Sequence, residues 1–342
     1  MKEKRTEISE LGEFELIERL SEGFKIKNEA TIKGIGDDAA VYAIGDNYLL
    51  ISSDMLLEGV HFDLSYVPLQ HLGYKAIAVN VSDIAAMNGT PQQITVNLGL
   101  SNRFSVEAVE AIYEGVKAAC DEYKVDLVGG DTTSSHSGLV ISVTVLGTVE
   151  KKMITYRNGA FENDILCATG DLGAAYMGLQ VLEREKQEFM ANPEMQPQLE
   201  KYTYIAGRQL RPKARMDIIH ELRDLNVKPT SMIDVSDGLA SDTLHICRQS
   251  NLGVAIHEDK LPIDKQTDET AAEFSINPGL CALNGGEDYE LLFTISQPDF
   301  DKIKNHADIH TIGYMQAASR GKSYVTVNQN AVELKAQGWK HF

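Results

Sequence analysis

Cysteine is scarce in this chain of 342 residues, which contains only four cysteines and no C-x-x-C pair. The four lie far apart in the sequence, at Cys120, Cys167, Cys247 and Cys281. This spacing favours neither a disulfide framework nor a zinc site made of thiolates. We therefore expect a reducing, cytoplasmic location.

Basic residues are also in deficit. The chain has 32 lysines and arginines against 50 aspartates and glutamates, which gives a formal net charge of -18. This balance argues against a general nucleic-acid binder and against a protein that binds anionic membrane surfaces. No apolar run approaches the roughly 18 residues that span a bilayer, and the N-terminus lacks the apolar core of a signal peptide.

The common nucleotide-binding motifs fail on inspection. Residues 34–39, GIGDDA, spell G-x-G-x-x-A, but two aspartates there would repel a pyrophosphate and no long helix pattern follows. RGKS at 320–323 lacks the first glycine of a P-loop, because that position is Gln316. ATGDLG at 168–173 could bind phosphate at a helix start, although a strand–turn–helix junction explains it equally well.

The remaining pattern predicts a mixed α/β or α+β chain in two domains. A charged, glycine-containing passage at 150–164 suggests domains at 1–149 and 150–342. Apolar runs predict strands at 39–44, 48–52, 94–100, 126–130, 139–149, 165–169, 231–235, 253–257, 289–295, 309–315 and 323–328. Helical periodicity predicts helices at 71–88, 105–123, 174–186, 199–209, 213–225 and 239–250.

Short acidic signatures recur after these apolar runs. LLISSD ends at Asp54, AVNVSD at Asp83, DLVGGD at Asp131 and MIDVSD at Asp237, while GIGDD contains Asp38. We expect such carboxylates to lie just past strand ends and to point into a cleft. Any one of them alone is better explained as a helix cap or turn aspartate, but their number favours a cluster.

Asp83 is the most informative of these aspartates. On a helix over 71–88 it would share one face with Leu72, Ala76, Val79 and Met87. A carboxylate on an apolar stripe must be paired or bind a cation, because burying it alone is very costly. Oxygen ligands without His or Cys pairs favour a hard ion, so we expect several Mg²⁺ ions that bridge a polyphosphate.

Seven motifs occur in an order that resembles the thiamine-monophosphate kinase family, within the superfamily of aminoimidazole ribonucleotide synthetase and selenophosphate synthetase. They are GIGDDAAV, ISSDMLLEGVHF, YKAIAVNVSDIAAMNGTP, VGGDTT, IDVSDGLASD, NGGEDYELLF and the terminal GWKHF. The resemblance implies an N-terminal βαββ-type sheet domain that pairs with a second copy in a homodimer, and a C-terminal α/β domain. It also implies that ATP binds between the domains and phosphorylates thiamine monophosphate to thiamine diphosphate.

The resemblance further implies roles for particular residues. The magnesium ligands would be Asp38, Ser52, Ser53, Asp54, Asp83, Asp131, Asp234 and Asp237, of which Asp54, Asp83 and Asp131 are the catalytic candidates. The ATP contacts would be Gly130, Asp131, Arg157 and Ser236. The contacts to thiamine monophosphate would be His61, Glu287 and Trp339.

Three of these residues also have ordinary structural explanations. His61 could be a turn histidine that packs on Phe62, Trp339 could anchor the C-terminus to the core, and Arg157 could be an exposed linker residue. Asp37 belongs to the same motif as Asp38, but we place it second as a metal ligand.

Two other functions stay open on the sequence. One is another ATP-dependent enzyme of the superfamily, such as aminoimidazole ribonucleotide synthetase, although GWKHF and EGVHF fit the thiamine kinases better. The other is a non-catalytic protein that binds magnesium and nucleotide.

Overall fold

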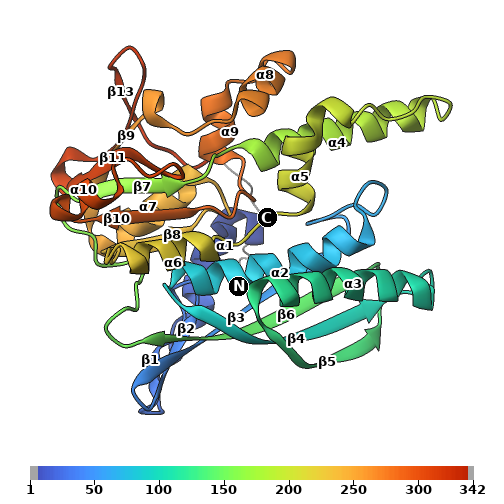
Figure 1. The fold of residues 1–342 in the computed structure, drawn as a ribbon, viewed down its shortest axis with the longest axis horizontal. Coiled ribbons are helices and arrows are strands. Elements are labelled where there is room, and N and C mark those ends of the chain that lie inside the picture. The colour runs from blue at the N-terminus through green and yellow to red at the C-terminus, as the bar shows by residue number, and fades with distance from the viewer. Residues whose placement is uncertain (1–6, 338–342) are drawn as a thin grey trace, which may run out of the picture.

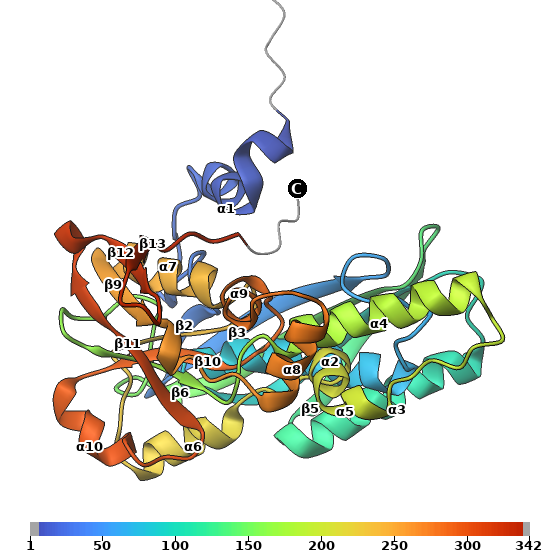
Figure 2. The same cartoon turned by 90° about the horizontal axis from the view of Figure 1, so that it is seen from above.

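The computed structural model describes residues 7–337, which form two β-sheets with helices packed against them (Figures 1 and 2). The first sheet has six strands in the order β1-β2-β3-β6-β4-β5. Its strands are β1 (Thr31–Lys33), β2 (Ala40–Ile44), β3 (Asn47–Leu57), β4 (Thr90–Leu100), β5 (Asp126–Ser134) and β6 (Val140–Glu150).

The long strands β3 and β6 pair antiparallel from Asn47–Glu150 to Leu57–Val140, and β4 pairs antiparallel with the other side of β6. The strand β5 joins β4 in parallel and ends the sheet. Every residue of β5 is solvent-exposed. The sheet therefore has one long edge that nothing in residues 7–337 covers.

Helices α2 (Leu69–Ala86) and α3 (Val106–Tyr123) lie side by side across this sheet (Figure 1). Their close approach requires Gly73 and Gly115, because a Cβ at either position would lie within 2 Å of a carbonyl oxygen of the other helix. Ser105 caps α3 as expected, since its side chain accepts a hydrogen bond from the backbone N–H of Ala108.

The second sheet has seven strands in the order β13-β12-β9-β11-β7-β10-β8. Its strands are β7 (Ile165–Thr169), β8 (Ser231–Asp234), β9 (Leu252–His257), β10 (Leu291–Ile295), β11 (Ile309–Ala317), β12 (Lys322–Val325) and β13 (Ala331–Glu333). The helices after residue 150 are α4 (Ala174–Ala191), α5 (Thr203–Leu210), α6 (Met216–Asp224), α7 (Leu239–Ser250), α8 (Lys265–Glu273), α9 (Pro278–Asn284) and α10 (Phe300–Ile303).

The helix α2 contacts both halves of the chain. It packs on β3, β4 and β6 of its own sheet, and it also contacts β8, α5 and α6 of the second half. Its buried side chains include Leu72, Ile77 and Ile84, so an apolar face fixes it on the sheet. The opposite side of α2 therefore meets residues that come more than 100 positions later.

The predicted mixed α/β architecture and the helices over 71–88 and 105–123 are confirmed. The expectation that the acidic residues lie just past strand ends is partly wrong. Asp54 and Asp131 lie inside β3 and β5 and Asp83 lies on α2, whereas Asp237 does follow β8, which ends at Asp234. The sequence patterns also did not predict α8, α9 or the helix α1 (Ile8–Ser21), which stands apart from the two sheets in Figure 2.

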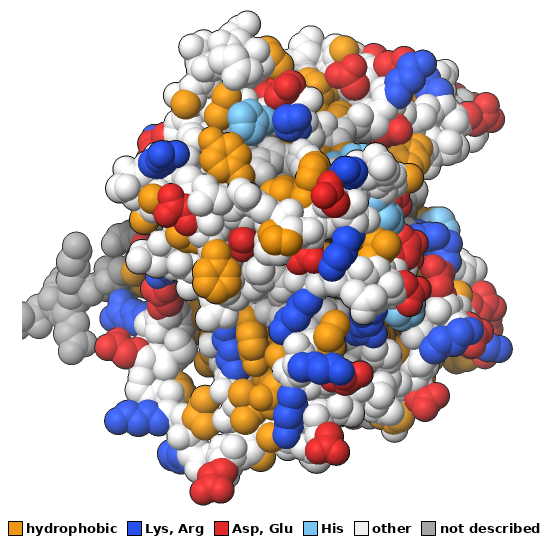
Figure 3. Space-filling model, turned by 60° about the vertical axis from the view of Figure 1, so that its left-hand side comes forward, with side chains coloured by type: hydrophobic (Ala, Val, Ile, Leu, Met, Phe, Trp, Pro, Cys, Tyr) orange, Lys and Arg blue, Asp and Glu red, His pale blue; other side chains and the backbone are white. Residues whose placement is uncertain are grey.

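Charged side chains of both signs are mixed on the face shown in Figure 3, with hydrophobic side chains between them. Among the described residues, no helix combines the length and the apolar character needed to cross a membrane.

Candidate active site

A cleft of about 1160 Å³ lies between the two halves of the chain, with α2 in its wall. Side chains from both halves line it. Ten of the residues singled out from the sequence are among them: Asp38, Ser52, Asp54, His61, Asp83, Arg157, Asp234, Ser236, Asp237 and Glu287. The sequence motifs therefore converge on one cavity, although they are spread over 250 positions.

Three carboxylates meet at the centre of the cleft. Asp38, Asp83 and Asp234 each offer one oxygen, and these oxygens all lie within 4.8 Å of one another. Asp38 comes from the loop before β2, Asp83 from α2 and Asp234 from the end of β8. The predicted cluster thus forms from three elements of different type.

Hydroxyl groups fix the orientation of two members of this cluster. The Ser52 hydroxyl donates to Asp83 Oδ2 at 2.5 Å, and the Ser82 hydroxyl donates to Asp234 Oδ2 at 2.6 Å. The third member differs, because Asp38 Oδ2 is buried and has no hydrogen-bond partner among residues 7–337. A buried carboxylate oxygen without a partner is costly unless a cation binds it.

Burial and mutual repulsion raise the pKa of each of these carboxyls. Burial raises the pKa of Asp38 to about 7, although the neighbouring Arg157 guanidinium opposes the shift. Burial likewise raises the pKa of Asp54 to about 6 and that of Asp234 to about 6. The pKa of Asp83 is also raised well above its ordinary value, by removal from water and by the carboxylates of Asp54, Asp234 and Asp38.

These features fit a divalent cation. The cluster supplies only oxygen ligands, one of them lacks a partner, and the pKa shifts show that the carboxylates are destabilised when no cation balances them. Asp38, Asp83 and Asp234 would hold such an ion, and Asp54 and Asp237 line the same cleft.

The raised pKa values of the clustered carboxyls predict an unusual pH dependence of stability for the metal-free protein. The folded-state pKa values of Asp38, Asp54 and Asp234 lie above the ordinary value of 3.8, so the native state binds more protons than the unfolded state between about pH 4 and 7. The contribution of these carboxyls to stability therefore falls as the pH rises through this window. Thermal unfolding with EDTA from pH 5 to pH 8 measures this slope.

Added Mg²⁺ should raise Tm more at pH 8 than at pH 5, because binding must displace protons at the lower pH. Asp83→Asn should flatten the slope of the metal-free protein, since it removes the group that all the others repel. The same dependence of Tm on pH in metal-free Asp83→Asn and wild type would contradict the assignment of Asp83 to the cluster of repelling carboxylates.

The adjacent aspartates of GIGDD have different environments. Asp37 forms an ion pair with Lys33 and accepts a hydrogen bond from the backbone N–H of Arg157 at 3.2 Å. Asp38 lies in the cluster and pairs with Arg157 Nη2 at 2.8 Å. This geometry supports a structural role for Asp37 and a ligand role for Asp38. Arg157 is 21% exposed, so it is not an ordinary solvent-facing linker arginine.

A second group of polar residues lies in the same cleft. Glu287 Oε2 accepts hydrogen bonds from Lys75 Nζ at 2.8 Å and from Gln209 Nε2 at 2.7 Å. His61 also lines the cleft, and its Nδ1 accepts the backbone N–H of Leu57 at 3.0 Å. His61 therefore stabilises the turn that carries it, as considered above, and it also lines the cavity.

Three predicted site residues do not line the cleft. Ser53 is exposed and hydrogen bonds to the carbonyl oxygen of Val143. Gly130 and Asp131 lie on the exposed edge strand β5. Through β6 and β4, this strand is three strand spacings from β3, which puts Asp131 about 14 Å from Asp54. Trp339 lies outside the described residues.

The motifs did not single out several residues of the site. Lys75 is 3% exposed, and its place on α2, four residues before Val79 and eight before Asp83, was the available signal. Asp242 does not line the cleft, but it is 1% exposed, and burial raises its pKa with the help of the charges of Asp237 and Asp234. It accepts a hydrogen bond from the backbone N–H of Gly238, where the loop after β8 turns. Its motif, IDVSDGLASD, pointed only to its first two aspartates.

The start of α4 decides between the two explanations of ATGDLG. Asp288 Oδ2 accepts a hydrogen bond from the backbone N–H of Gly173 at 2.8 Å, and Oδ1 accepts from Ala175. A carboxylate of the chain itself thus occupies this helix N-terminus. The segment is a strand–turn–helix junction and not a phosphate site.

Comparison with known proteins matches both halves of the chain to domains of one family. Residues 36–149 match the family described as AIR synthase related protein, N-terminal domain, and residues 162–326 match the corresponding C-terminal domain. The thiamine-monophosphate kinase of Bacillus subtilis is 34% identical over 338 residues, which cover 97% of this chain and 100% of the relative. That of Aquifex aeolicus is 36% identical, covering 98% of this chain and 99% of the relative.

Solved structures agree with this. The structure of AaThiL complexed with AMPPCP and TMP has a TM-score of 0.84 and 33% identity, and it covers 99% of this chain and 100% of that one. The hydrogenase maturation protein HypE of E. coli has a TM-score of 0.67 at 15% identity over 99% of this chain and 92% of its own, and shares the fold alone.

Proposed function

This chain belongs to the thiamine-monophosphate kinase family of AIR synthase related proteins, and we propose that it transfers the γ-phosphoryl group of ATP to thiamine monophosphate. The products are ADP and thiamine diphosphate. The observation that carries the proposal is the cluster of Asp38, Asp83 and Asp234 at the centre of a cleft large enough for two substrates.

The acceptor in this reaction is a phosphate and not an alcohol. Its second pKa is about 6, so near neutral pH it is already ionised and requires no general base. The obstacle is repulsion between two anionic substrates. Mg²⁺ held by the carboxylates would neutralise the phosphates. Asp83 on α2, Asp234 at the end of β8 and Asp38, held by its ion pair with Arg157, would keep the phosphates aligned for in-line attack.

Different residues of the cleft suit the two substrates. Arg157, which pairs with Asp38, offers a guanidinium for phosphate oxygens of ATP. Ser236, the other proposed ATP contact, lies next to Glu287, whose backbone N–H donates to the Ser236 carbonyl oxygen at 2.8 Å. His61 and Glu287 line the same cleft and would contact thiamine monophosphate together with Trp339. Because both substrates would share one cleft, direct transfer needs no phosphorylated protein intermediate.

The proposal includes a homodimer. The edge strand β5 is exposed along its whole length, with Leu127 at 42% and Val128 at 58% exposure. Uncovered strand edges invite pairing, and a second copy of the chain would cover this one. In such a dimer Gly130 and Asp131 of one copy would serve the cleft of the other, which accounts for their distance from Asp54 within one chain. The cytoplasmic location stays a prediction.

The test is an assay of purified protein with Mg-ATP and one of three acceptors: thiamine monophosphate, thiamine or formylglycinamidine ribonucleotide. We expect ADP and thiamine diphosphate with the first acceptor alone. Product from formylglycinamidine ribonucleotide would assign the chain to aminoimidazole ribonucleotide synthesis instead. Nucleotide binding without ADP formation from any acceptor would indicate a non-catalytic binding protein.

A further inference from the structure

The loop that carries Glu287 has an unusual backbone. Gly286, Glu287 and Tyr289 have φ angles of 69°, 58° and 52°, in the left-handed region that L side chains rarely adopt. Backbone of this kind persists only where the surrounding contacts determine it, and it is concentrated at ligand-binding sites. Specific contacts must therefore hold this loop in place.

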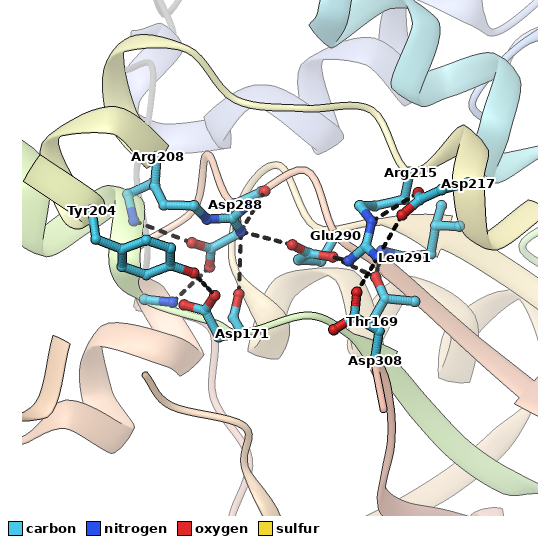
Figure 4. A network of polar contacts seen from close by, with 12 residues as sticks. Thr169, Asp171, Tyr204, Arg208, Arg215, Asp217, Asp288, Glu290, Leu291 and Asp308 are labelled. Carbon is cyan, nitrogen blue, oxygen red and sulfur yellow. Dashed lines mark hydrogen bonds and ion pairs between the residues drawn. The ribbon is translucent and has the colours of Figure 1, made fainter. Parts of the chain in front are cut away.

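Asp288 and Glu290, which do not line the cleft, make the contacts that fix the backbone of this loop (Figure 4). Arg208 Nη2 donates to the backbone oxygen of Asp288 at 3.1 Å and forms an ion pair with Glu290 Oε1 at 2.8 Å. Glu290 Oε2 forms an ion pair with Arg215 Nη1 at 2.6 Å. Asp288 is bound in turn by the backbone at the start of α4.

Different contacts fix the Glu287 carboxylate itself. Lys75 Nζ and Gln209 Nε2 both donate to Oε2, and Lys75 Nζ also donates to the backbone oxygen of Gln209 at 3.2 Å. Gln209 follows Arg208 on α5, so adjacent residues of one helix hold both sides of the loop. Because both side-chain donors use Oε2, Oε1 is left as the acceptor for a ligand.

Lys75 is well placed to set this geometry. Its side chain is 4% exposed, and a lysine this deeply buried requires charged or polar partners. It lies eight residues before Asp83 on the same face of α2, a separation of about 12 Å along the helix. One rigid helix therefore fixes the distance between the carboxylate cluster and Glu287.

We propose that Lys75 and Gln209 are positioning residues that orient Glu287 toward the organic end of the acceptor substrate. The inference rests on the proposed function and adds how that substrate is selected. Glu287 Oε1 would accept a hydrogen bond from an amino group, or pair with a positive charge, in a substrate whose phosphate lies at the cluster. Lys75 would not itself contact the substrate phosphate, because that phosphate would lie at the cluster, about 12 Å away along α2.

Steady-state kinetics of Lys75→Met test this role. The KM for thiamine monophosphate should rise about tenfold, while kcat and the KM for ATP change less than about threefold. Lys75→Arg keeps the charge and the donors, and it should recover most of the lost affinity. Lys228→Met is the matched control, because Lys228 donates to the backbone oxygen of Lys152 and is not among the residues that line the cleft.

A double-mutant cycle with Glu287→Gln distinguishes positioning from direct binding. If Lys75 acts through Glu287, adding Lys75→Met to Glu287→Gln should change the KM for thiamine monophosphate less than about twofold further. Additive effects, or an equal rise in both KM values, would overturn the proposal. A lower Tm with unchanged KM values would do the same, since it would show a purely structural role.

These outcomes are separable from failure of the proposed function. If wild-type protein forms no thiamine diphosphate, the proposed function is wrong. The affinities of wild type and Lys75→Met for whichever acceptor of the assay is turned over, measured by calorimetry, then replace the kinetic test. If wild type is active and Lys75→Met has wild-type KM values, the function stands and the positioning role is wrong.

Discussion

Asp83→Asn is expected to lower kcat by about 1000-fold, because it removes the central charge that neutralises the metal-bound phosphates in the transition state. The same change should raise the Tm of the metal-free protein at pH 8 by about 2 °C, which corresponds to about 1 kcal/mol at this chain length. The reason is that Asp54, Asp234 and Asp38 all raise the pKa of Asp83 by repulsion. Asparagine keeps the shape and can still accept the hydrogen bond from Ser52.

Activity and stability are therefore expected to change in opposite directions at this position. Turnover with saturating Mg-ATP and thermal unfolding in EDTA measure the two effects on the same preparation. Asp299→Asn is the control, because Asp299 pairs with Ser296 and Lys302 outside the cleft and should leave kcat unchanged. A kcat for Asp83→Asn within tenfold of wild type would show that Asp83 is not in the catalytic machinery, whatever its effect on Tm.

Much of this site could be predicted because buried charge is rare. Asp83 interrupts an apolar helical stripe, and such an interruption is visible in the amino-acid sequence itself. The structure brings its carboxylate to within 4.8 Å of those of Asp38 and Asp234, as the recurring acidic signatures suggested. Periodicity was sufficient here because a helix fixes which residues share a face.

Other features depended on tertiary contacts that leave no local signal. Lys75 on a helix resembles a solvent-facing lysine until α5 and the Glu287 loop are placed over it. The strand β5 continues through Gly129, Gly130 and Asp131, which have low strand propensity, because it pairs in parallel with β4. The expected strand was therefore too short, and Asp131 was expected to follow it.

The place of Asp131 on the exposed edge strand β5 predicts that two inactive variants restore activity when they are mixed. Asp131→Asn and Asp83→Asn should each be nearly inactive alone, yet a mixture of the two chains should regain about one quarter of wild-type activity. In a twofold dimer that shares residues across the interface, half of randomly paired dimers are mixed. Each mixed dimer then contains one cleft with Asp83 from one chain and Asp131 from the other, while its second cleft lacks both.

Co-expression of the two variants with different affinity tags allows the mixed dimer to be purified and assayed directly, with expected activity about half that of wild type per dimer. The paired control is Asp83→Asn with Asp234→Asn, which both alter the cluster within one chain and should not restore activity in any mixture. The exposed edge of β5 gives this experiment its structural basis, since a second chain that covers this edge would bring Asp131 to its own cluster. An inactive mixed dimer of Asp131→Asn and Asp83→Asn would show that Asp131 does not serve the cleft of a second copy.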